Sequence, residues 1–366
     1  MRKGWEYKRW KEVLTIINGK NQSAVVDENG EYPIYGSGGI MGYANNWLCP
    51  ENCVIIGRKG NINKPIFVET KFWNVDTAFG LNANKEYLLP KFLYYFCLDY
   101  NFERHNKAVT IPSLTKADLL KIDIPLPPLS TQLAIVSELD KINELIRLKK
   151  EQLKDFDNLA QSLFYEMFGD PVENEKGWEV KTFGEIGSVE RGAGISKKDF
   201  VKEGLPCIHY GQLHTILGPR TTKHFTSIPH NLLPKYKIAH TGDLVMAITS
   251  EDVEGSCKST VWLGDYDIIV GSDAAIFHHK QDGTFLSYYT MTKAFFNEKA
   301  KYAKGFKVTH ISAKEIEKIP VYLPPLPLQR LFAQRIEQIE REKSEVQKSI
   351  QDLETLLASR MQYWFE

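Results

Sequence analysis

Two long stretches of the chain place apolar residues at alternating steps of four and three, the spacing of a coiled-coil seam. Residues 130–168 contain no proline or glycine, Ser130 or Thr131 can cap their start, and residues 169–171 read Gly-Asp-Pro. The second stretch covers residues 328–365. Both are predicted to be single long helices. The predicted pairing positions are Ile135, Leu139, Ile142, Ile146, Leu153, Phe156, Leu163, Phe332, Ile336, Ile339, Val346, Ile350, Leu353 and Leu357.

An isolated helix cannot leave such a seam in water, so the two helices are predicted to pair with each other. A helix of ~39 residues is roughly 58 Å long. Successive major grooves on one face of DNA recur every ~34 to 36 Å, so a rod of this length suits a spacer between two DNA-binding domains. The alternative is that each helix packs only on its own globular domain.

The chain also repeats itself. Gly4-Trp5-Glu6 is matched by Gly177-Trp178-Glu179 at an offset of 173, and Leu126-Pro127-Pro128-Leu129 by Leu323-Pro324-Pro325-Leu326 at an offset of 197. Gln132 matches Gln329 at the second offset. Each Pro-Pro step ends the preceding segment because proline cannot donate to a strand ladder. The second copy is therefore 24 residues longer, and the extra length lies inside it.

The segments before the Pro-Pro steps are predicted to be mixed α/β domains rich in short strands. Residues 54–57, 65–68, 244–248 and 267–270 are brief apolar runs typical of strands, and residues 35–43 form a glycine-dense turn. Helices are expected at 91–100 and 285–296. The predicted fold class is α+β, with two such domains joined and spaced by two long antiparallel coiled-coil helices. The expected boundaries are 1–128, 129–169, 170–325 and 326–366.

Composition limits the function classes. The 46 basic and 46 acidic residues cancel, which argues against a protein that coats nucleic acid through bulk positive charge. Five cysteines without CxxC spacing predict neither a disulfide framework nor a zinc site. No apolar run approaches the ~18 residues of a membrane span, and the first residues lack the apolar core of a signal peptide. We therefore expect a soluble cytoplasmic protein.

Several loops combine cations, hydroxyls and glycines, the groups that contact phosphates and base edges. Gly57-Arg58-Lys59-Gly60 is one such turn, and residues 191–198 form a similar basic loop in the second copy. For each residue an ordinary surface role remains the alternative. The candidate DNA-binding residues are Ser37, Gly38, Arg58, Lys59, Lys107, Ser113, Thr115, Lys116, Arg191, Lys197, Lys198, Lys304, Lys307, Thr309 and His310.

Catalytic and cofactor signals are weak. The glycines at 36–39 lack the GxxxxGK[ST] pattern of a phosphate-binding loop, so a nucleotide site is the less favoured interpretation. His278 and His279 are adjacent on a predicted strand, so their side chains point to opposite faces and do not suit a shared metal. No hydrolase elbow or metalloprotease helix is present. The chain is therefore expected to have no active site, metal or cofactor of its own.

The doubled order of domain, Leu-Pro-Pro-Leu and long helix resembles the specificity subunits of type I restriction-modification systems over essentially the whole chain. Local phrases that resemble the family's target-recognition domains are Tyr35-Gly36-Ser37-Gly38-Gly39-Ile40 with Gly42-Tyr43, Ile55-Ile56-Gly57-Arg58-Lys59-Gly60, Phe72-Trp73, Asp76-Thr77, Leu114, Ile122 and Gly242-Asp243-Leu244-Val245. Residues 248–255 depart from the family's simpler glycine turn, so no contact residue is carried over there.

The resemblance implies that each domain reads one half of a split site on double-stranded DNA and that the helices set the spacing. It also implies two methyltransferase subunits docked along the helices and, in some complexes, restriction subunits. S-adenosylmethionine, ATP and Mg²⁺ belong to those partners, not to this chain. Two other hypotheses stay open at this point: a structural adaptor that binds no DNA, and a nucleotide-using enzyme built around the Gly36 loop.

Overall fold

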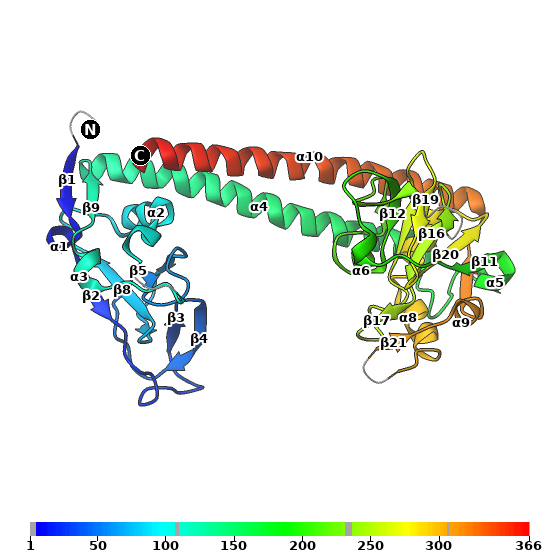
Figure 1. The fold of residues 1–366 in the computed structure, drawn as a ribbon, viewed down its shortest axis with the longest axis horizontal. Coiled ribbons are helices and arrows are strands. Elements are labelled where there is room, and N and C mark those ends of the chain that lie inside the picture. Colours follow the sequence, from blue (N-terminus) through cyan, green and yellow to red (C-terminus); the bar gives the residue numbers. More distant parts are fainter. Residues whose placement is uncertain (1–4, 107–109, 231–235, 306–307, 366) are drawn as a thin grey trace. The chain divides into compact units, whose positions relative to one another are not determined.

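The computed structural model describes residues 5–106, 110–230, 236–305 and 308–365. The chain divides into two compact units. Unit 1 comprises Met1–Glu151 with Gln347–Glu366, and unit 2 comprises Gln152–Val346. Each long helix therefore contributes one part to unit 1 and the other part to unit 2 (Figure 1).

Unit 1 contains three small sheets, with strand orders β2-β8-β5-β6, β4-β3-β7 and β1-β9. Strand β5 is buried along its whole length because its apolar residues are covered on both faces. The strands are β1 (Glu6–Arg9), β2 (Leu14–Asn18), β3 (Tyr32–Gly36), β4 (Gly39–Ala44), β5 (Cys53–Gly57), β6 (Ile66–Val68), β7 (Trp73–Asn74), β8 (Ala78–Ala83) and β9 (Asp123–Leu126). The short helices are α1 (Trp10–Val13), α2 (Pro90–Asp99), η1 (Phe102–His105) and α3 (Lys116–Leu119).

Unit 2 is larger, with sheets ordered β11-β20-β16-β18-β13, β14-β12-β19-β15, β10-β22 and β17-β21. The strands are β10 (Glu179–Thr182), β11 (Gly187–Arg191), β12 (Leu205–Ile208), β13 (Arg220–Thr221), β14 (Thr226–Ile228), β15 (Lys237–Ala239), β16 (Leu244–Ala247), β17 (Thr249–Ser250), β18 (Ser259–Trp262), β19 (Ile268–Val270), β20 (Ala274–His279), β21 (Thr309–His310) and β22 (Pro320–Leu323). The short helices are α5 (Phe183–Ile186), η2 (Lys197–Asp199), α6 (Tyr210–Thr215), α7 (Gly283–Tyr289), α8 (Lys293–Ala300) and α9 (Ala313–Ile316).

The single helix predicted over residues 285–296 is wrong, because the structure has two helices there, α7 and α8. Thr292 separates them. Its backbone is extended and its hydroxyl accepts a hydrogen bond from the backbone N–H of Phe295, so it caps the start of α8. The apolar spacing continues across this break, so the sequence pattern alone predicts one continuous helix.

The two long helices, α4 (Leu129–Phe168) and α10 (Leu326–Phe365), are 40 residues each and contact each other within each unit. In unit 1, Arg360 donates to Glu138 and Lys150 Nζ lies 2.7 Å from a Glu354 carboxylate oxygen. Residues later on α4 contact residues earlier on α10, so the two helices run antiparallel. In unit 2, Lys343 Nζ lies 2.7 Å from Asp157. All fourteen predicted pairing positions are buried or half-buried.

The helix ends also belong to the globular cores. In unit 1, Trp364 stacks on Trp5 with ring centroids 6.3 Å apart, and Phe365 contacts Phe92 at 5.2 Å. In unit 2, Phe332 is fully buried among the rings of α4 and α7. The alternative that each helix packs only on its own domain therefore does not describe unit 1, where the end of α10 packs on the first globular segment.

The repeated glutamines make the same joint in both units. The Gln132 side chain donates to the Pro127 carbonyl at 2.9 Å and accepts from the backbone N–H of Leu89 at 2.9 Å. Gln329 donates to the Pro324 carbonyl at 2.8 Å and, in unit 2, accepts from the N–H of Asp282, the residue that caps α7, at 3.0 Å. Both glutamines are fully buried. In each unit, the buried glutamine amide thus links the Pro-Pro step and the start of a neighbouring helix to a long helix. Loss of these hydrogen bonds would leave a buried amide unpaired, which costs free energy of folding.

The five cysteines are buried thiols with no disulfide among them. Within the described residues, no cluster of three or more His, Cys, Asp or Glu side chains has a geometry that could hold a metal ion. No helix in that part of the chain is both long and apolar enough to cross a membrane.

Candidate nucleic-acid interface

In unit 1, the structure brings several predicted DNA-binding residues into one loop cluster. Residues 35–43 are not a simple turn but the β3–β4 hairpin, whose two-residue tip is Ser37 and Gly38 (Figure 1). This tip lies against the turn after β5: a β-carbon built on Gly60 would lie 3.9 Å from the Ser37 hydroxyl. Because the glycine-rich segment joins two strands and no helix, it lacks the strand-to-helix form of a phosphate-binding loop.

The basic turn after β5 is held on two sides. The backbone N–H groups of Arg58 and Lys59 both donate to the Thr77 carbonyl, at 2.8 and 3.2 Å. On the other side Lys59 forms a β-bridge with Ser113, and the N–H of Gly60 donates to the Pro112 carbonyl at 3.0 Å. Arg58 and Lys59 are exposed. Ser37, Gly38, Arg58, Lys59 and Ser113 therefore share one surface cluster.

Two other candidates in unit 1 have intramolecular roles. Thr115 caps helix α3 through a hydrogen bond from the backbone N–H of Asp118 at 3.2 Å. The ammonium of Lys116 donates to the Ile16 carbonyl at 2.6 Å. Their sequence pattern is thus explained by local structure, the ordinary alternative for these residues. Lys107 lies outside the described residues.

In unit 2, a second cluster forms where β17 pairs with β21. Thr249 is opposite His310 in this pair, and the Thr249 hydroxyl lies 3.3 Å from His310 Nδ1. The same hydroxyl is 3.5 Å from the Asp273 carboxylate, and Arg191 Nη2 is 4.0 Å from that carboxylate. Arg191 also donates through Nε to the Ser272 carbonyl at 2.9 Å. Arg191 and His310, far apart in sequence, are therefore connected through Thr249 and Asp273.

The remaining candidates of unit 2 differ in their surroundings. Lys304 is exposed and bridges to His310, with its ammonium paired to Glu315. Thr309 is buried and does not offer its hydroxyl to a ligand at the surface. Lys197 and Lys198 are exposed on η2, and burial together with the charge of Lys197 lowers the pKa of His209. Lys307 lies outside the described residues.

The two clusters occupy equivalent places in their units. Strand β5 is followed by the turn that pairs with Ser113, and strand β16 is followed by Thr249, which pairs with His310. Ser113 and His310 are separated by 197 residues, the offset of the Leu-Pro-Pro-Leu steps. Sequence reasoning did not single out Thr249, although it follows the buried apolar run 244–248 much as Arg58 follows β5.

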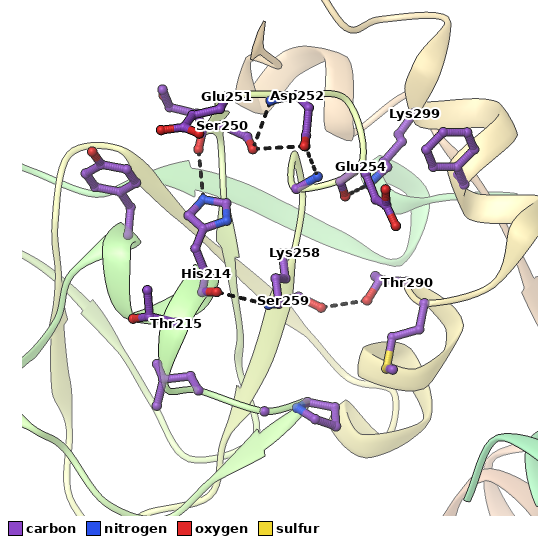
Figure 2. Close-up of a pocket in the computed structure, with 18 of the residues that line it drawn as sticks. His214, Thr215, Ser250, Glu251, Asp252, Glu254, Lys258, Ser259, Thr290 and Lys299 are labelled. Atoms are coloured by element: carbon purple, nitrogen blue, oxygen red, sulfur yellow. Dashed lines mark hydrogen bonds between the residues drawn. The ribbon is translucent and has the colours of Figure 1, made fainter. Parts of the chain in front are cut away.

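The equivalent loops carry different charges. Unit 1 presents Arg58 and Lys59, whereas the longer loop of unit 2 presents Glu251, Asp252 and Glu254. Beside this loop is an open cleft of about 1270 Å³, shown in Figure 2. Besides the acidic loop, the residues along it include Tyr210, His214, Lys258, Met291, Lys293, Phe296 and Val308. Sequence analysis did not predict this cleft, because its walls come from α6, β17, β18, α8 and the segment between α7 and α8, which meet only in the folded chain.

Two side chains fix the shape of the cleft wall. His214 Nε2 lies 3.1 Å from the Thr249 carbonyl oxygen, and the buried Lys299 ammonium donates to the Glu254 carbonyl at 2.8 Å (Figure 2). Burial lowers the pKa of Lys299 because desolvation disfavours its charged form. Lys299 therefore acts as an internal anchor for the acidic loop and is not available as a surface cation.

The adjacent histidines at the end of β20 have separate surroundings. His278 Nδ1 lies 2.8 Å from Asp243, whereas His279 Nδ1 lies 3.1 Å from the Gln281 carbonyl. Burial lowers the pKa of His279 to about 4, so it is neutral at physiological pH. The two rings form hydrogen bonds to different groups, because neighbours on a strand point to opposite faces.

Comparisons with known proteins assign the chain to a family. The model of the type I restriction modification DNA specificity domain matches residues 2–155 and again residues 175–355. The chain belongs to this family. The family assignment agrees with the resemblance found in the sequence, and its two matched segments follow the repeat read from the Gly-Trp-Glu and Leu-Pro-Pro-Leu motifs.

Individual family members are similar over most of their length. The type I restriction enzyme MjaVIII specificity subunit of Methanocaldococcus jannaschii is 24% identical, covering 96% of this chain and 92% of its own. The EcoDI specificity subunit of Escherichia coli is 22% identical over 94% of this chain and 83% of its own. A solved S subunit of M. genitalium has a TM-score of 0.58 at 14% identity, covering 99% of this chain and 96% of that one. A chain from a structural study of type I R-M complex assembly has a TM-score of 0.61 at 19% identity, covering 99% and 97%. The chain shares the fold of these structures.

Proposed function

We propose that this chain is the DNA-specificity subunit of a type I restriction-modification complex and reads a bipartite, asymmetric site on double-stranded DNA. The observation that carries the proposal is the presence, in two family-matched segments, of two equivalent but chemically different loop clusters. Base contacts specify sequence whereas phosphate contacts position the protein, so two clusters with different side chains select different bases.

The charges of the two clusters support unlike half-sites. Arg58 and Lys59 suit phosphates or the acceptor edge of guanine, where arginine makes the commonest specific contact. Glu251 and Asp252 repel phosphates but accept hydrogen bonds from the amino groups of cytosine or adenine. On this proposal, unit 1 reads one half-site and unit 2 reads the other. The proposed contacts also include Ser37, Gly38, Ser113, Arg191, Lys197, Lys198, Lys304 and His310.

The long helices have a second role in the proposal: they set the spacing of the two readers and dock two methyltransferase subunits. Their pairing seam is buried, but Leu133, Leu145 and Leu148 remain 61%, 46% and 46% exposed on α4. Exposed leucines that repeat on one helix are typical of a surface covered by a partner. The methyl donor and any ATP or Mg²⁺ are then held by partner subunits, and this chain has no catalytic role.

The test is to express the chain together with a methyltransferase subunit of its own system and to map methylated adenines across the genome. The proposal expects one two-part motif with an unread gap, and loss of that motif when the chain is omitted. Methylated adenines scattered without a two-part motif, or a motif unchanged when this chain is omitted, would overturn it.

A substitution pair sharpens the test. Arg58→Ala with Lys59→Ala should weaken or relax only one half of the motif, because both residues lie in unit 1. The matched control is Lys85→Ala with Lys121→Ala, which removes the same charge from unit 1 away from the loop cluster. If both double variants alter the motif equally, bulk charge rather than the cluster determines binding.

A further inference from the structure

One exposed aliphatic side chain stands at the same place in each unit. Ile111 is 59% exposed and Val308 is 53% exposed. They are separated by 197 residues, the offset of the second repeat. The residue three positions later is buried in both units, as Leu114 and Ile311. In both units, this segment therefore buries the later aliphatic side chain in the core and leaves the earlier one exposed to solvent.

Both residues lie beside the candidate DNA-contacting clusters. In unit 1, Ile111 precedes Pro112, whose carbonyl accepts the N–H of Gly60 at the end of the basic turn. In unit 2, Val308 precedes Thr309, which pairs with Ser250 of β17. Val308 also lines the cleft beside β17. Each aliphatic side chain is thus placed by the same backbone pairing that places the polar candidates.

A single exposed aliphatic residue is normal on a soluble protein and needs no explanation. Here the exposure recurs in two segments that share little sequence, at a loop already selected by its cations and hydroxyls. Core packing does not explain this recurrence, because both side chains face solvent. A ligand that presents an apolar group among polar ones would explain the recurrence.

Resting on the proposed function, we infer that Ile111 and Val308 each contact the 5-methyl group of a thymine in the major groove, one in each half-site. Thymine is the base that presents an apolar group in that groove, and aliphatic side chains are its usual partners. The neighbouring charges suit this position. Arg58 and Lys59 beside Ile111 match phosphate and guanine acceptors, while Glu251 and Asp252 beside Val308 match amino donors on base edges.

A protein partner is the other class of occupant for an exposed aliphatic residue. The charged loops beside Ile111 and Val308 disfavour it, because protein interface cores are depleted of charge. The cleft that Val308 lines also exposes Met291 and Phe296, so a protein partner is kept as an outcome of the test. The inference therefore commits to DNA, and the test below separates the two.

The experiment uses the complex with its methyltransferase subunits and synthetic duplexes that carry the motif mapped in cells. Each thymine of the motif is replaced in turn by deoxyuridine, which removes only the 5-methyl group. The inference expects one thymine in each half-site whose replacement weakens binding about three- to five-fold, the effect of losing one buried methyl contact.

The variants Ile111→Ser and Val308→Ser assign the contacts. Ile111→Ser should remove the deoxyuridine effect in one half-site and leave the other unchanged, and Val308→Ser should do the reverse. Leu98→Ser and Val180→Ser are matched controls, because these residues are 44% and 50% exposed in units 1 and 2 and lie away from the clusters. Thermal melts of all four variants establish that each remains folded.

The outcomes are distinguishable. If the unmodified complex shows no two-part motif, the proposed function itself fails. If the motif is present but no thymine in either half-site responds to deoxyuridine, or if the response survives Ile111→Ser and Val308→Ser, the thymine contact is wrong while the proposed function stands. Loss of methyltransferase binding in these two variants, but not in the controls, would assign the residues to a protein interface and also overturn the inference.

Discussion

Replacing Phe332 by alanine should destabilise unit 2 far more than any exposed substitution on the same helix. The Phe332 side chain is 0% exposed, and its ring centroid lies 5.6, 5.3 and 5.3 Å from the rings of Phe164, Phe168 and Tyr288. Truncating a buried phenylalanine costs about 3–5 kcal/mol through lost burial and the cavity left behind. These aromatic contacts place the expected loss toward the upper part of that range.

Urea unfolding followed by circular dichroism measures this loss. With a denaturant dependence of about 2–3 kcal/mol per molar urea, the unfolding midpoint should fall by about 1–2.5 M. The control is Leu331→Ala, one residue earlier on α10 and 42% exposed, which should change stability by less than about 0.5 kcal/mol. Equal and small shifts for both variants would refute the conclusion that α10 forms part of the core of unit 2.

Three further predictions concern unit 2. The Lys304 ammonium, together with the N–H and hydroxyl of Ser312, lowers the pKa of Glu315 to about 2. These contacts stabilise the fold above the ordinary carboxylate pKa, and the contribution is lost as pH falls toward 2. Lys304→Met should raise the Glu315 midpoint measured by NMR, and an unchanged midpoint would contradict the pairing. Burial raises the pKa of Cys257 to about 12, so iodoacetamide should label it only after unfolding; rapid labelling of the native chain, detected by mass spectrometry, would show that it is accessible. Gly305 has a φ of +120°, and a β-carbon there would lie 2.0 Å from the Val308 carbonyl oxygen, so Gly305→Ala should distort this loop. The variant should relax the sequence preference of the mapped methylation motif in one half-site only. A change in both half-sites or in neither would argue against the assignment of this loop.

Much of the fold could be predicted from the sequence because its strongest signals are local. The seam of α4 and α10 repeats over many turns, so both helices were placed within about two residues of their observed ends. Strands β5, β6, β16 and β19 are short apolar runs with turn residues beside them, and each was placed to within about one residue of its observed bounds. The break at Thr292 was missed because a cap depends on one side-chain hydrogen bond that the apolar spacing does not reveal.

The candidate site was less predictable because it depends on contacts between distant segments. Composition singles out Lys59 and Ser113, but their proximity arises from a β-bridge across more than fifty residues. The same composition also selected Thr115 and Lys116, which the fold uses for a helix cap and a backbone contact. Hydroxyls and cations serve both purposes equally well, so residue type alone could not separate ligand contacts from internal ones.

On the proposed function, two unlike readers in one chain recognise two half-sites separated by a gap of fixed length. The most direct measurement is the methylation rate on duplexes carrying the mapped motif, first with the gap sequence scrambled at constant length and then with one or two base pairs inserted. Scrambling should have little effect, whereas each insertion, which shifts and rotates one half-site about the DNA axis, should reduce the rate at least tenfold. Tolerance of the insertions, or strong dependence on the bases within the gap, would contradict it.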